Sequence, residues 1–112
     1  MAGTETSDSG KPSRGSQPIV INIVPGPEGP TVDQRVAVVH DNQRIRWVAR
    51  GPVEWWVVKI ERNNSVDDGN GGFVFYPGHD TTAPLDFDGQ NIIKYSIAIP
   101  SGVMDPHIIP MP

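Results

Sequence analysis

The sequence predicts an all-β protein, folded as an antiparallel Greek-key β-sandwich of about seven strands. Gly and Pro occur twelve times each and interrupt the chain at short intervals, which favours short strands over helices. No window repeats its apolar residues at helical spacing. Several segments instead alternate apolar and polar residues, as half-buried strands do. Because one sheet alone would leave an aromatic face in water, two packed sheets are expected.

The length of 112 residues fits one domain. Residues 1–17 are rich in Gly, Ser and Thr and have almost nothing to bury, so they are predicted to form a disordered N-terminal tail. Residues 18–112 are predicted to form a single sandwich domain.

The expected strands cover residues 18–24, 35–40, 44–50, 53–61, 73–76, 93–99 and 108–109. Prolines in segment 25–30 end the first strand because they cannot donate to a ladder. Pro106 and Pro110 bound the last one for the same reason. In the second strand, Val36 and Val38 share a face.

Two strands show the clearest alternation. Strand 44–50 turns its apolar side chains inward and its arginines outward. Strand 93–99 does the same with Lys94, Ser96 and Ala98 outward. The inward residues of the two strands are Ile45, Trp47, Ala49, Ile93, Tyr95, Ile97 and Ile99. Between them, the loop 63–72 has the composition of a flexible hairpin tip, and it lacks the ligand order of a calcium loop.

Three segments together resemble the cupredoxin-like sandwich family. Residues 35–47 are similar to its early hairpin, in which alternating valines lead through a polar turn to a buried aromatic residue. Residues 94–99 resemble the strand that leads to the copper loop. Residues 104–109 resemble the closing strand of copper-free bacterial members. The family's copper site needs a cysteine thiolate, and this chain has no cysteine, so a blue-copper centre is excluded and no cofactor is expected.

The net charge of −4 argues against nucleic-acid binding and against docking on anionic lipid. No apolar run is long enough to span a membrane, and the start of the chain does not resemble a signal peptide. The sequence therefore predicts a cytoplasmic protein with no nucleic-acid or membrane partner.

The expected function is a non-enzymatic binding or structural module that acts through a protein partner or through self-association. Trp55 and Trp56 are adjacent, so a strand sends them to opposite faces. One belongs to the core, and the other either packs under the loop 63–72 or is available to a partner. Arg44, Arg46 and Arg50 form a stripe that could grip a carboxylate-rich partner, or simply be the solvated side of a sheet.

The alternative function is a copper carrier that uses His and Met ligands at one end of the sandwich. The candidate ligands are His79, Met104, His107 and Met111. The competing interpretation is a solvated histidine and methionines that fill gaps. A nucleophilic triad can be drawn on paper from Ser96 or Ser101 with a histidine, but no motif supports it, and no enzyme activity is expected.

Overall fold

The computed structural model describes residues 17–40, 42–61, 66–85 and 92–111. The tail predicted for residues 1–17 lies outside this part of the chain, apart from Gln17. The described residues form strands and no helix. In chain order the strands are β1 (Ile19–Gly26), β2 (Gly29–Val32), β3 (Val36–His40), β4 (Ile45–Ala49), β5 (Val57–Ile60), β6 (Val74–Phe75), β7 (Ile93–Ile99), β8 (Gly102–Met104) and β9 (His107–Met111).

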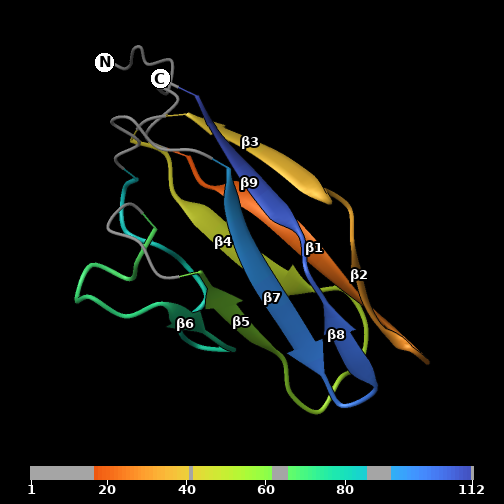
Figure 1. The fold of residues 1–112 in the computed structure, drawn as a ribbon. Helices are drawn as coiled ribbons and strands as arrows, with labels where there is room; N and C mark the ends of the chain where they lie inside the picture. Colours follow the sequence, from red (N-terminus) through yellow and green to blue (C-terminus); the bar gives the residue numbers. More distant parts are fainter. Residues whose placement is uncertain (1–16, 41, 62–65, 86–91, 112) are drawn as a thin grey trace, which may run out of the picture.

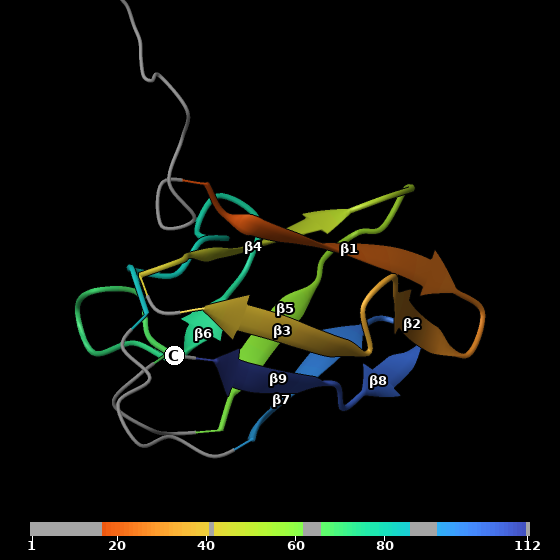
Figure 2. The ribbon, with the colours of Figure 1, turned by 90° about the horizontal axis from the view of Figure 1, so that it is seen from above.

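The strands form two sheets (Figure 1). The smaller sheet has the order β2–β1–β4. The larger has the order β3–β9–β7–β5–β6, and β8 also pairs with β7. Figure 2 shows β1 and β4 lying over β9 and β7, with β3 between these layers at the side.

Both sheets are mixed, so the predicted purely antiparallel arrangement is wrong. β1 pairs with β4 in parallel, and β3 pairs with β9 in parallel. The chain crosses to the larger sheet after β2 and returns at β4, which brings β4 alongside β1 in the same direction. The described residues also contain nine strands where about seven are expected.

The inner faces of the two sheets share one core. Trp47 of the smaller sheet contacts Phe75 of β6, with ring centroids 5.1 Å apart, and Tyr95 of β7, at 5.6 Å. The predicted inward face of β7 is confirmed, because Ile93, Tyr95, Ile97 and Ile99 are all buried. In β4, Ile45 and Trp47 are fully buried and Ala49 is half-buried.

Proline does not end the first strand where the sequence predicts it. β1 continues through Pro25 to Gly26 and turns back into β2, so that Pro25 lies opposite Pro30. The ladder between β1 and β4 stops at Ile23, and the missing N–H of Pro25 is therefore not needed by that neighbour.

The last strand likewise runs through Pro110. The His107 N–H donates to the Arg35 carbonyl at 2.9 Å, which fixes the side of β9 that faces β3. Alternate residues point their N–H groups to opposite sides, so Pro110 faces away from β3. On that side β7 pairs only with His107 and Ile108. The predicted boundary at Pro110 is thus wrong, and the strand is an interior one.

The two sheets are joined at one end by a hydrogen-bonded junction. The Gly29 N–H in the β1–β2 hairpin donates to Ser101 Oγ at 3.0 Å, and the Ser101 hydroxyl donates to the Gly26 carbonyl at 2.6 Å. Figures 1 and 2 place β2 beside β8, the strand that follows this serine. Neither β2 nor β8 is predicted from the sequence.

Candidate protein-binding surface

β3 is an edge strand of the larger sheet, and one side of its backbone has no strand partner among the described residues. The parallel register sets Val36 opposite His107 and Val38 opposite Ile109. Because the His107 N–H bonds to Arg35, the ladder uses the N–H and C=O groups of His107 and Ile109 and directs those of Val36 and Val38 away from β9. Val36 and Val38, with these outward backbone groups, are called the β3 edge below.

The side chains of the β3 edge are also exposed. Val36 is 50% and Val38 is 47% exposed, whereas Ala37 and Val39 between and beyond them are fully buried. Ile109 is half-buried opposite Val38, so it continues the apolar strip onto β9. An extended segment that pairs with β3 would therefore find both free hydrogen-bonding groups and apolar side chains.

Val36 and Val38 are predicted from the sequence to share a face, but they are not among the predicted site residues. Both faces of this strand are apolar, so alternation alone does not tell which one is buried. The presence of apolar residues on both faces is itself the sequence signal of this site, since a strand that is buried on one face needs a polar opposite face.

One tryptophan of the pair is buried and the other is exposed, but both precede β5, so the predicted strand 53–61 is too long. Trp56 is 4% exposed and belongs to the core, whereas Trp55 is 45% exposed. Both lie in the connection between β4 and β5, just before the strand begins at Val57. Trp55 is therefore the tryptophan that a partner could reach.

The predicted arginine stripe is exposed, and two of its members bond to their neighbours. Arg46 Nε lies 3.4 Å from Asp80 Oδ2, and Arg50 Nε donates to Asn22 Oδ1 at 2.5 Å. Arg44 is exposed just before β4. These contacts match the solvated side of a sheet, and exposed pairs of this kind contribute little to stability.

The structure does not bring the proposed copper ligands to one place. Met104 lies opposite the buried Ile97 and packs against the core, while His107 lies opposite the exposed Lys94. Cross-strand neighbours share a face, so these two side chains are on opposite faces of the sheet.

His79 is further away, in the turn after β6. Two strands separate β6 from β9, which corresponds to about 14 Å across the sheet. The backbone of Met111 ends β9, opposite His40. Within the described ranges, no three His, Cys, Asp or Glu side chains gather as a metal-binding group.

The described part of the loop 63–72 is organised by Asp68. Its Oδ1 accepts hydrogen bonds from the N–H groups of Asn70 at 2.8 Å and Gly72 at 2.9 Å, and its Oδ2 lies 2.9 Å from His79 Nε2. The backbone bonds from Asn70 and Gly72, and then the bond to His79, lower the pKa of this carboxyl. Both oxygens of Asp68 therefore face donors of the protein itself, and the His79 ring stacks on Phe75. Residues 63–65 of the predicted loop lie outside the described residues.

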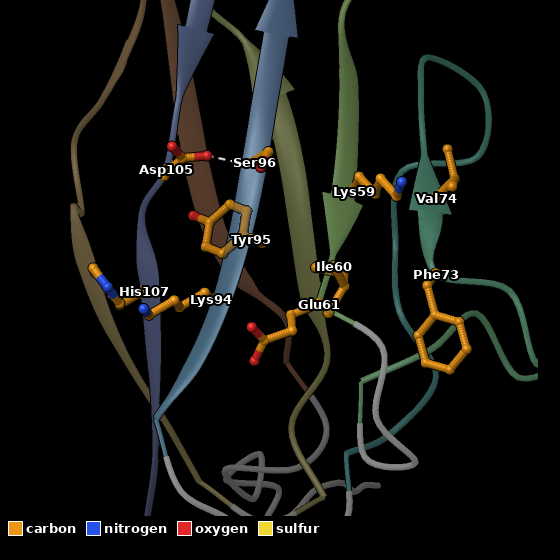
Figure 3. Close-up of a pocket in the computed structure, with 10 residues that line it drawn as sticks. All are labelled: Lys59, Ile60, Glu61, Phe73, Val74, Lys94, Tyr95, Ser96, Asp105 and His107. Carbon is orange, nitrogen blue, oxygen red and sulfur yellow. Dashed lines mark hydrogen bonds between the residues drawn. The ribbon is translucent and has the colours of Figure 1, made fainter.

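A second surface feature is a groove of about 740 Å³ on the larger sheet (Figure 3). Its charged rim mixes Lys59, Lys94 and Glu61 with Asp105, whose carboxylate accepts a hydrogen bond from the Ser96 hydroxyl at 2.7 Å. His107 lies at the side of the groove nearest β3. Because cations and carboxylates alternate around it, the groove favours no single charge of ligand.

The two serines considered for a nucleophilic triad make other hydrogen bonds. Ser96 bonds directly to Asp105, and Ser101 bonds to the hairpin carbonyl of Gly26. In the residues that the structure describes, neither serine bonds to a histidine.

No helix in the described part of the chain is long and apolar enough to cross a membrane. Comparisons of the chain with protein-family models, with curated proteins and with solved structures find no match in any of the three.

Proposed function

We propose that this chain is a non-enzymatic protein-binding module that accepts an extended segment of a partner at the β3 edge. Strand addition uses main-chain hydrogen bonds for affinity and alternate side chains for specificity. The β3 edge offers both, because the outward backbone groups and the exposed side chains belong to the same two valines.

The observation that carries the proposal is that, in the part of the chain that the structure describes, no segment pairs with this edge. Natural sheets blunt their edges with charged residues, prolines, bulges or covering segments. Residues 36–39 are Val, Ala, Val and Val, without a charge or a proline. The bonds of Ser96 and Ser101 support the non-enzymatic part of the proposal.

The finer fold assignment is part of the same proposal. We keep the Greek-key sandwich of cupredoxin-like type, supported by the shared core of the two sheets and by the three segments that resemble the family. The absence of cysteine removes the thiolate that a blue-copper site needs. The cytoplasmic location stays a prediction.

A peptide selection tests the proposed function. Random ten-residue peptides are displayed and selected on the wild-type protein, and binders are then measured against V36K/V38K. We expect enrichment of alternating β-branched sequences, and at least about tenfold weaker binding to the charged edge. The control is V24K/V103K, which charges two other exposed valines. No enrichment, or equal binding to both variants, would overturn the proposal.

A further inference from the structure

We propose that the partner of the β3 edge is a second copy of this chain, paired antiparallel through β3 about a two-fold axis at Ala37. This inference deepens the proposed function, since it names the occupant of the same edge.

One symmetric register pairs the whole free edge with residues of β3 alone. With Ala37 on the axis, Val36 of each copy lies opposite Val38 of the other. Residues that face each other in this way exchange both backbone hydrogen bonds, so the outward groups of both valines are paired in both copies. In a register shifted by one residue, the second copy would have to bond to Ala37, whose backbone groups point towards β9 instead.

Registers shifted by two residues need backbone groups beyond the two valines of the free edge. If Val38 faced Val38, then Val36 would face His40 of the second copy. The His40 N–H already donates to Gln43 Oε1 at 2.8 Å, and its carbonyl accepts from the Gln43 N–H at 3.2 Å. If Val36 faced Val36, Val38 would instead lie opposite Gln34, which precedes β3 and is not part of the strand.

The side chains fit the same register. Valines would face valines on the outer surface, and Gln34 would face His40 at each end, so no like charges oppose each other. On the inner surface the axis passes between two alanines, where the non-hydrogen-bonded pair brings the chains closest.

The free edge is also short. Gln43 already hydrogen-bonds to both the N–H and the carbonyl of His40. The backbone groups available to a partner therefore end at Val38. A second copy presents an edge of the same length and composition. Such a small contact gives a weak dimer, with a dissociation constant of roughly 10 to 1,000 µM.

Sedimentation equilibrium of the full chain tests the inference. We expect a concentration-dependent dimer for the wild type and for V24K/V103K. V36K/V38K places like charges opposite each other and should dimerise at least about tenfold more weakly. Near-ultraviolet circular dichroism of the buried tryptophans checks that each variant is folded. A wild type that stays monomeric up to about 1 mM overturns the inference.

The variant V36K/V38E tests the register itself. With Ala37 on the axis, each introduced lysine faces an introduced glutamate, so dimerisation should return to within about threefold of the wild type and should weaken with salt. In the two shifted registers, like charges face each other at the axis. Dimerisation as weak as that of V36K/V38K would therefore overturn the proposed pairing.

The peptide selection separates this inference from the proposed function. If the wild type is monomeric but selected peptides bind and depend on Val36 and Val38, self-pairing fails and strand addition stands. If neither dimer nor peptide binding is found, both proposals fail.

Discussion

At the scale of single residues, Tyr95 is a polar side chain in an apolar place. It is 2% exposed, and its hydroxyl has no hydrogen-bond partner within the described residues. The indole N–H of Trp47 lies in the same part of the core, but the two groups do not meet as a hydrogen bond. Burial raises the pKa of Tyr95 to about 12, against a smaller opposing effect of Trp47.

Tyr95→Phe is expected to leave stability at pH 7 unchanged or to raise it by about 1 kcal/mol, because a buried unpaired hydroxyl is removed. The unfolded chain ionises this phenol near pH 10, whereas the folded pKa is about 12. Wild-type stability should therefore fall by about 1 kcal/mol between pH 10 and 11 through this group, and the variant should lack that loss.

Urea unfolding at pH 7, 10 and 11 measures both effects. Tyr76→Phe is the matched control, since Tyr76 is 47% exposed and should change neither result. A loss of about 2 kcal/mol or more at pH 7 in Tyr95→Phe would show that the hydroxyl has a partner.

At the scale of elements, the junction between the β1–β2 hairpin and the β7–β8 turn is tightly built. A Cβ on Gly102 would lie 2.9 Å from the Glu28 carbonyl oxygen and 3.0 Å from Gly29 Cα, so the two backbones would have to separate. Ser101 joins the same two elements through the hydroxyl bonds to Gly26 and Gly29.

Ser101→Ala and Gly102→Ala are each expected to reduce the free energy of unfolding by about 1–3 kcal/mol. The first leaves an N–H and a carbonyl unpaired, and the second forces the close backbones apart. Ser96→Ala, on the outer face of β7, is the control and should cost less than about 1 kcal/mol. Thermal and urea unfolding give the values. Equal effects of Ser101→Ala and Ser96→Ala would contradict the role given to this junction.

The strands also show which features of the fold can be predicted from sequence patterns. The inward faces of β4 and β7 are predicted correctly because each strand has one apolar and one mixed face. The parallel pairings are not predictable from local patterns, since they depend on where the chain crosses between sheets. The strand ends predicted at Pro25 and Pro110 are wrong for a related reason. Whether a proline interrupts a ladder depends on which side its missing N–H would face.

The candidate site is predictable only in part. The sequence predicted one buried tryptophan but did not tell that Trp55 is the exposed one, and both lie outside the strand in which they were expected. Val36 and Val38 were grouped correctly on one face, yet the neighbouring Ala37 and Val39 are as apolar, and the buried pair is decided by packing against the other sheet.

At the scale of the whole molecule, the sheet order explains why β3 is the edge that matters. The edge of β4 is covered by residues 80–82, because the Trp47 N–H donates to the Asp80 carbonyl and the Thr82 N–H to the Ile45 carbonyl. The opposite edge strand, β2, is four residues long, contains Pro30 and contacts β8.

In the larger sheet, β6 has only two residues and ends in the Tyr76–His79 turn. Short strands, prolines and covering segments are the usual protections of sheet edges. Among the edge strands of the described sheets, β3 is the one that combines five residues with exposed valines.

Amide hydrogen exchange tests most directly whether β3 presents a free backbone edge. It is measured by nuclear magnetic resonance on V36K/V38K, in which pairing between copies is suppressed. The account predicts rapid exchange at positions 36 and 38 and slow exchange at Ala37 and Val39, whose N–H groups face β9. Slow exchange at all four positions in this variant would show that another segment of the chain covers the edge, and would contradict the account.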